Sequence, residues 1–203
     1  MKIFYLSILL LTSAKIIGSE NIHLTETSKT DFVNTGESVT AKNAKVSYIN
    51  AGGSIIATNT IAKTLNAGGS ITLDHCQITN MINTGGSFTA DQCDLLGAIA
   101  AGGAADISKC PSILSISAGG SVKIKDSNIS GKLACSSNYL TLEGSKIDII
   151  DINCSSKNKK EPQILELRNC KVRDIFFESG LGEVILLDQS SVSGSITGGK
   201  IQT

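Results

Sequence analysis

The sequence predicts an all-β fold, a narrow single-stranded parallel β-helix (solenoid) with about 17 residues in each coil. Three observations predict it: a glycine-led unit recurs at a nearly fixed spacing, apolar and polar residues alternate within each unit, and β-branched residues are frequent. We expect a right-handed helix, because crossovers between parallel strands almost always have that hand. The 203 residues suit one domain, and nothing in the sequence indicates a second.

The N-terminal residues predict export. Lys2 is followed by an apolar run from Ile3 to Leu11 and by small residues up to Ala14, which is the pattern of a secretory signal peptide. We therefore expect residues 1–14 to be a signal peptide, with Gly18 as the latest cleavage point. The apolar run is shorter than the roughly 18 residues that span a bilayer, so we expect no membrane span. The mature protein is expected to be secreted, periplasmic or at the cell surface.

Residues 19–32 show no repeat, and we interpret them as a leader that caps the first coil, although residues 23–25 could start a strand. The β-helix domain then occupies residues 33–203. It begins with a degenerate unit at Val33, in which Glu37 replaces the second glycine. Coils stacked about 4.8 Å apart would make a rod of about 48 Å for roughly ten coils.

The repeat unit reads apolar-x-small-Gly-Gly-small-apolar, and its clearest copies start 16, 17, 17 and 17 residues apart. A period this short excludes helical-hairpin repeats, which need more than about 30 residues. Each unit therefore corresponds to one coil, and we expect the Gly-Gly pairs to form turns that need positive φ. The five copies are Ile49–Ile55, Leu65–Ile71, Ile82–Phe88, Ile99–Ala105 and Ile116–Val122.

Aligned coils place similar side chains in columns. One column is aliphatic and the column two residues later is small, so we expect both to face the interior. Between them, stacked asparagines predict a ladder of amide hydrogen bonds along the rod. The aliphatic column is Val33, Ile49, Leu65, Ile82, Ile99, Ile116, Leu133, Ile152, Ile175 and Ile196. The small column is Thr35, Ala51, Ala67, Thr84, Ala101, Ala118, Cys135 and Cys154, and the asparagines are Asn34, Asn50, Asn66 and Asn83.

The six cysteines fall into such columns, and we interpret them as small buried residues of the stack. Cys135 and Cys154 share the small column in adjacent coils, where a Cα separation of about 4.8 Å permits a disulfide. This is the pair we expect if a disulfide forms. No spacing resembles a zinc site, and we expect no cofactor. A second column of small residues contains Cys76, Cys93, Cys110, Ser127, Ser145, Cys170 and Ser190.

One place combines residue types that act as acid and base. His75 follows Asp74, and Asp91 falls in the column of Asp74 one coil later. The repeat places no Ser, Lys or second His to complete a catalytic set, so we expect a solvated corner here. We therefore assign no catalytic residue and expect that the protein is not an enzyme.

The overall charge of the chain and one insertion in the repeat indicate what kind of partner to expect. The chain has 18 basic and 18 acidic residues, so no charge excess indicates nucleic acid or an anionic membrane as the partner. A long insertion leaves the regular coils, and loops on a regular scaffold are frequent sites of specific contact. The candidate partner-contact loop is Ser155, Ser156, Lys157, Asn158, Lys159, Lys160 and Glu161.

The column pattern from Val33 to Gln202, with its Gly-Gly-Ser-apolar-x-apolar core, resembles bacterial adhesin-like β-helix repeat proteins. It is also similar to the bactofilins, polymer-forming β-helices that lack a signal peptide. The resemblance implies an adhesin-like surface or secreted binding or scaffold module that contacts a protein or glycan surface. The alternative is a structural protein that polymerises through its coil ends, and a polysaccharide-active enzyme is the least favoured hypothesis. Neither family offers a catalytic residue for this sequence.

Overall fold

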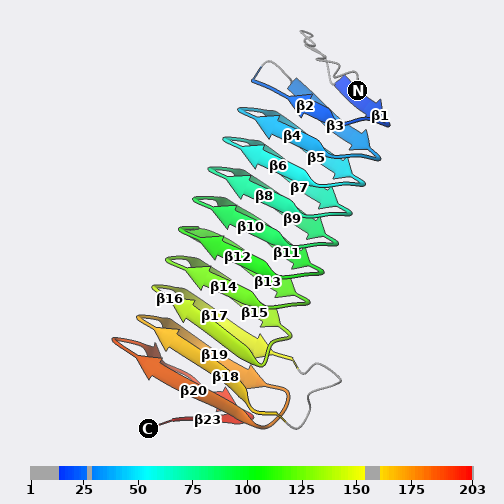
Figure 1. The fold of residues 1–203 in the computed structure, drawn as a ribbon. Helices are drawn as coiled ribbons and strands as arrows, with labels where there is room; N and C mark the ends of the chain where they lie inside the picture. The colour runs from blue at the N-terminus through cyan, green and yellow to red at the C-terminus, as the bar shows by residue number, and fades with distance from the viewer. Residues whose placement is uncertain (1–13, 27–28, 154–160, 203) are drawn as a thin grey trace.

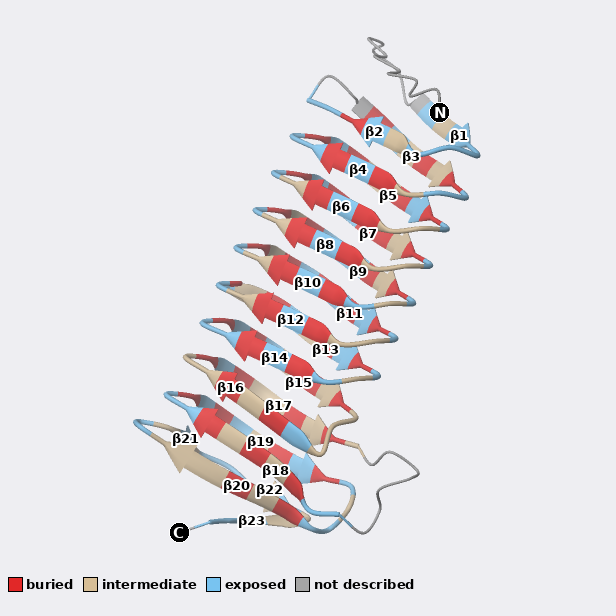
Figure 2. Ribbon diagram, viewed as in Figure 1, coloured by how far each residue is buried: buried red, intermediate tan, exposed pale blue. Residues whose placement is uncertain are grey.

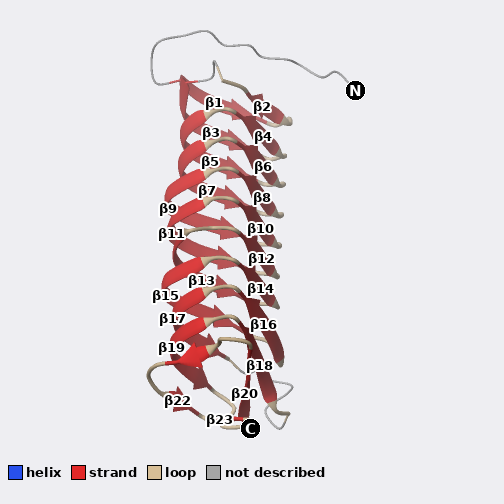
Figure 3. Cartoon of the chain, turned by 90° about the vertical axis from the view of Figure 1, so that its left-hand side faces the viewer, coloured by secondary structure: helices blue, strands red, loops and turns tan. Residues whose placement is uncertain are grey.

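A computed structural model describes residues 14–26, 29–153 and 161–202, and it shows a parallel β-solenoid. The chain makes about 10 turns of about 17 residues, stacked along one axis as a straight rod (Figures 1 and 3). The predicted fold class is therefore confirmed, and its hand stays a prediction. The described residues form strands, turns and loops, and no helix among them is long and apolar enough to cross a membrane.

Two parallel sheets run the length of the rod; up to β21 the odd-numbered strands lie in sheet A and the even-numbered strands in sheet B, and then β22 joins sheet A and β23 joins sheet B. Sheet A contains β1 (Ala14–Gly18), β3 (Lys29–Thr35), β5 (Lys45–Ala51), β7 (Ile61–Ala67), β9 (Gln77–Thr84), β11 (Asp94–Ala101), β13 (Ser112–Ala118), β15 (Asn128–Cys135), β17 (Lys146–Ile152), β19 (Lys171–Phe177), β21 (Ser191–Val192) and β22 (Ile196–Thr197). Sheet B contains β2 (Ile22–Leu24), β4 (Val39–Lys42), β6 (Ile55–Thr58), β8 (Ile71–Asp74), β10 (Phe88–Asp91), β12 (Ala105–Ser108), β14 (Val122–Lys125), β16 (Tyr139–Glu143), β18 (Gln163–Arg168), β20 (Gly182–Leu187) and β23 (Gly199–Ile201).

The core lies between the two sheets, and buried residues alternate with exposed ones along the strands (Figure 2). The predicted aliphatic column is confirmed from Val33 to Leu133, because each member pairs with the next and is at most 2% exposed. Side chains on a strand alternate between faces, so this column places the intervening residues outside. Each added coil extends the same aliphatic stack.

The predicted alignment is wrong in the coil after Leu133. Leu133 pairs with Ile150, not Ile152, and Ile150 pairs with Ile175. Cys135 consequently lies beside Ile152 in the small column. The shared column proposed for Cys135 and Cys154 is therefore incorrect, and Cys154 itself lies outside the described residues.

The stacked coils begin earlier in the chain than Val33. Ile16 of β1 pairs with Val33, and β2 pairs with β4 in sheet B. Residues expected to form a leader thus include β2 and the first half of β3. The predicted signal peptide falls on residues 1–13, which lie outside the described part of the chain, and on Ala14, the first residue of β1.

The asparagine ladder forms in two separate steps. Asn50 donates to the amide oxygen of Asn34 at 2.6 Å, and Asn83 donates to that of Asn66 at 3.0 Å. Between these steps Asn66 donates instead to the Tyr48 hydroxyl at 2.7 Å. Tyr48, in the same coil as Asn50, therefore replaces Asn50 as the acceptor for Asn66.

The Gly-Gly pairs of the five regular units do not serve the purpose that the sequence suggested, since none of them has positive φ; in the last coil, Gly198 of the Gly198-Gly199 pair does, with φ of 73°. The regular pairs are required by the close approach of neighbouring coils: a Cβ atom on Gly68 would lie 2.4 Å from the carbonyl oxygen of Gly52. In eight of the described turns, positive φ occurs at the opposite corner of the coil on a residue other than glycine, including Asp188 between β20 and β21. The other seven residues are Asn43, Asn59, His75, Gln92, Lys109, Asp126 and Asn169.

Candidate functional site

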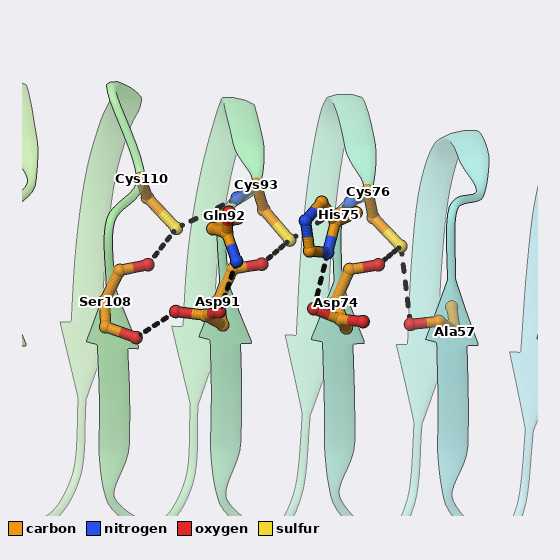
Figure 4. Close-up of polar contacts among 9 residues, drawn as sticks. All are labelled: Ala57, Asp74, His75, Cys76, Asp91, Gln92, Cys93, Ser108 and Cys110. Atoms are coloured by element: carbon orange, nitrogen blue, oxygen red, sulfur yellow. Dashed lines mark hydrogen bonds and ion pairs between the residues drawn. The ribbon is translucent and has the colours of Figure 1, made fainter.

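The corner that leads from sheet B to sheet A has a repeated structure (Figure 4). A residue with positive φ is followed by a small residue, whose side chain turns back to the carbonyl oxygen two positions earlier. The Cys93 thiol, for example, donates to the carbonyl of Asp91 at 3.1 Å, and the Ser127 hydroxyl donates to that of Lys125 at 2.8 Å. The left-handed residue turns the chain, and the small residue closes the turn.

The same small side chains also connect one coil to the next. Cys76 donates its backbone N–H to the Cys93 sulfur at 3.2 Å, and Cys93 donates to the Cys110 sulfur at 3.4 Å. The series then continues through Ser127, Ser145, Cys170 and Ser190. The predicted column of small buried residues is thus confirmed from Cys76 to Cys170, and its last member, Ser190, is partly buried. The sulfur and oxygen atoms of the column satisfy backbone N–H groups that would otherwise be buried without a partner.

Four of the five described thiols, those of Cys76, Cys93, Cys135 and Cys170, have a pKa above the usual value, whereas the hydrogen bond with Cys93 lowers the pKa of Cys110. Hydrogen bonding to Cys110 raises the pKa of Cys93 to about 12, and burial raises the pKa of Cys135 to about 12. Since the thiolate is the reactive form, such cysteines are poor nucleophiles at neutral pH. The arrangement indicates a structural role for this column.

The acid and base residues lie at the outer side of this corner. His75 Nδ1 lies 2.7 Å from Asp74 Oδ1, and both side chains are about half exposed. Asp91 accepts hydrogen bonds from the Ser108 hydroxyl and from Gln92 Nε2, and these bonds, chiefly that of Ser108, lower the pKa of Asp91. The corner therefore holds a carboxylate–imidazole pair and a separate carboxylate–hydroxyl pair.

The repeat places Ser108 one coil after Asp91, a position that sequence reasoning did not single out. This serine does not complete a catalytic set. Ser108 lies two coils from His75, a separation of about 10 Å at the usual strand spacing. The serine bonds to the Asp91 carboxylate and the histidine to Asp74, so the imidazole does not contact the hydroxyl. Among the described residues, no group of three or more His, Cys, Asp or Glu side chains could hold a metal ion.

The predicted partner-contact loop falls almost entirely on residues 154–160, which the structure does not describe. Its last residue, Glu161, is exposed and accepts a hydrogen bond from Asn138 Nδ2 at 2.8 Å. The role assigned to the loop stays a prediction.

A different surface emerges on sheet A. The outward-facing side chains of β9, β11 and β13 include Met81, Leu96 and Leu114, which are 40%, 47% and 48% exposed. Asp94 supplies the one charge in these three strands. We call this surface the neutral patch and define it as Thr79, Met81, Leu96, Ala98, Ala100, Leu114, Ser115 and Ser117.

The surface of the neutral patch is uneven. Ala98, Ala100, Ser115 and Ser117 floor a shallow groove of about 370 Å³ that extends to Met81 and Lys132. Leu96 and Leu114 occupy adjacent strands on the β11 and β13 side of it and protrude as a ridge. The leucine ridge and the adjacent floor of one-carbon side chains form a raised and a recessed area, which a partner surface of complementary shape can contact.

The outer face of sheet B is different. Its outward positions carry charges of both signs along the rod, and several of them pair, as Lys125 does with Glu143 at 3.3 Å. The charged outward residues include Lys42, Asp74, Asp91, Asp106, Lys123, Lys125, Glu143, Glu166 and Arg168. The two faces of one rod therefore differ in chemistry. Sequence reasoning missed the neutral patch, although the signal was present in Leu95-Leu96, where two apolar residues are adjacent in an alternating strand.

Comparisons of this chain with models of protein families, with curated proteins and with solved structures find no match.

Proposed function

We propose that this protein is an exported, non-enzymatic β-helix repeat protein that acts as an adhesin-like binding or scaffold module. The observation that carries the proposal is the neutral patch on sheet A. Contiguous exposed apolar side chains on a soluble protein commonly mark a site of interaction. Leu96 and Leu114 are each about half exposed on adjacent strands, whereas sheet B presents charges at its outward positions.

The regular stack also supports a scaffold role. Each coil contacts its neighbours through the aliphatic column, the small-residue ladder and the glycine contacts, so the outward side chains are held at a fixed spacing. A rigid array of this kind presents a flat face without the entropy cost of ordering loops. The separation of His75 from Ser108 favours binding over catalysis at the corner.

End-to-end polymerisation is the second candidate. β1 pairs with β3 along one edge, and its other edge faces no described strand. Unpaired strand edges are templates for another chain. At the opposite end, β21, β22 and β23 have only 2, 2 and 3 residues, which limits the pairing they can offer. Ile201→Pro should abolish filaments if this hypothesis holds, and unchanged filaments would refute it.

Substitutions on the two faces test the proposed function. Purified wild-type protein is applied to arrays of immobilised polysaccharides, cell-surface proteins and the wild-type protein itself, beside Leu96→Lys, Leu114→Lys and the control Ile56→Lys. Ile56 is 51% exposed on sheet B, so its replacement adds the same charge on the other face. We expect the two leucine variants to lose binding and the control to keep it. Equal binding by all four proteins, or binding by none, would overturn the proposal.

A further inference from the structure

We propose that the partner of the neutral patch is a second copy of this chain, packed face to face on sheet A with the two rods parallel and related by a two-fold axis along the rod. This inference rests on the proposed function, because it identifies what the patch binds. In the proposed dimer the same patch of both copies forms a symmetric contact, which is the commonest kind in homo-oligomers.

The shape of the patch supports this symmetry. A two-fold axis along the rod places each coil opposite the same coil and reverses the order of residues along the strand. With the axis between Leu96 and Ala98, the Leu96 side chain of one copy meets Ala98 of the other, and Leu114 meets Ser115. The leucine ridge of each copy then enters the groove of its partner. If the rods ran in opposite directions, the leucine column would face itself and ridge would meet ridge.

The charges on sheet A support the same arrangement. Outside the neutral patch the face carries charged residues, and like charges directly opposite one another would oppose association. In the parallel arrangement no charged residue of β11, β17 or β19 meets a like charge. In a reversed arrangement centred on β11, Asp94 meets Asp94 of the second copy. The parallel arrangement instead places Arg173 opposite Asp174, Lys146 opposite Asp151 and Asp94 opposite Ala100.

Sedimentation velocity across a concentration series tests whether the dimer exists. We expect wild type and Ile56→Lys to show a monomer–dimer equilibrium, and Leu96→Lys and Leu114→Lys to shift it at least tenfold toward monomer. A wild-type chain that stays monomeric, or a leucine variant that dimerises as well as wild type, would overturn the inference. Circular dichroism of each variant shows whether the rod has folded, and Leu96→Ser is a milder variant if lysine prevents folding.

Crosslinking tests the direction of the rods. In a Cys154→Ser background, Ser47→Cys places a thiol on β5 near one end of sheet A, and Thr40→Cys places one on sheet B as the control. Face-to-face sheets lie about 10 Å apart, so a bismaleimide of that span should join position 47 of two parallel copies. In the reversed arrangement centred on β11, the two copies of position 47 would lie about 30 Å apart. A dimer that crosslinks at neither position, or equally at both, would overturn the parallel face-to-face arrangement.

The two proposals fail differently. A wild-type monomer that still binds an array ligand, and loses it in Leu96→Lys, would refute the second copy as partner and keep the proposed function. A patch whose leucines affect neither binding nor dimerisation would refute both.

Discussion

Gly85 lies directly over Gly68 of the preceding coil, and a Cβ atom on Gly85 would be 2.5 Å from the Gly68 carbonyl oxygen. The contacted atom is backbone, so the coils themselves would have to separate. The same contact recurs at Gly52, Gly102 and Gly119. It explains why the unit keeps its first glycine although the φ angle there does not demand one.

Gly85→Ala is therefore expected to lower the free energy of unfolding by about 1–3 kcal/mol, the usual cost of overpacking. Gly36→Ala is the matched control, because a Cβ atom on Gly36 meets nothing within 4 Å. Urea unfolding of both variants measures the difference. If the two alanine variants are equally stable, the close approach of coils is not what keeps the glycine.

Cys93 tests the ladder at the corner. Its sulfur accepts the backbone N–H of Cys76 at 3.2 Å, and serine fills the same column at Ser127 and Ser145. Cys93→Ser keeps an acceptor and is expected to change stability little. Cys93→Ala leaves a buried N–H without a partner, which costs about 1–3 kcal/mol. Thermal unfolding compares the two, and an equal loss in both would show that the hydrogen bond contributes nothing.

The sequence allowed the fold to be predicted because its columns repeat without interruption up to Leu133. It failed in the next coil for a physical reason: Ile150 and Ile152 both face inward on β17, so alternation alone cannot choose between registers that differ by two residues. The pairing of the strand backbones sets which of the two registers forms. The Gly-Gly pairs were assigned to positive φ because sequence cannot distinguish a special dihedral angle from a lack of space. Leu96 was not predicted because strand alternation alone does not show which outward residues of neighbouring coils form a surface.

Alkaline pH should weaken the fold through its buried thiols. Burial raises the pKa of Cys135 from 9.0 to about 12 in the folded state. Below pH 9 both states hold the proton, and stability does not depend on this group. Between pH 9 and 12 the unfolded thiol loses its proton while the folded one keeps it, so the free energy of unfolding falls. The limiting slope is about 1.4 kcal/mol per pH unit for each such thiol.

Melting temperatures measured from pH 8 to about pH 11 check this expectation. Lysines and tyrosines also titrate in this range, so the comparison is with Cys135→Ala, which lacks the thiol. We expect a shallower decline in the variant. Identical declines would assign the alkaline sensitivity to other groups.

The position of signal-peptide cleavage would decide whether β1 remains in the folded protein. Cleavage after Ala14 would leave Lys15–Gly18 paired with β3, whereas cleavage after Gly18 would remove the strand and uncover Val33, which is 0% exposed. Ile16 packs against the core from β1. A chain beginning at Ser19 should lose about 2 kcal/mol of burial relative to one beginning at Lys15.

In a solenoid such a loss concentrates in the nearest coil, because each coil contacts only its neighbours. Hydrogen exchange is therefore the sensitive measurement: amides of β3 should lose protection in the shorter chain, while those of β11 keep it. On the proposal that the chain is exported, the mature protein is expected to begin at Lys15, as measured by mass spectrometry. A mature N-terminus at Ser19, with β3 fully protected, would show that β1 is dispensable and that the rod starts at the second coil.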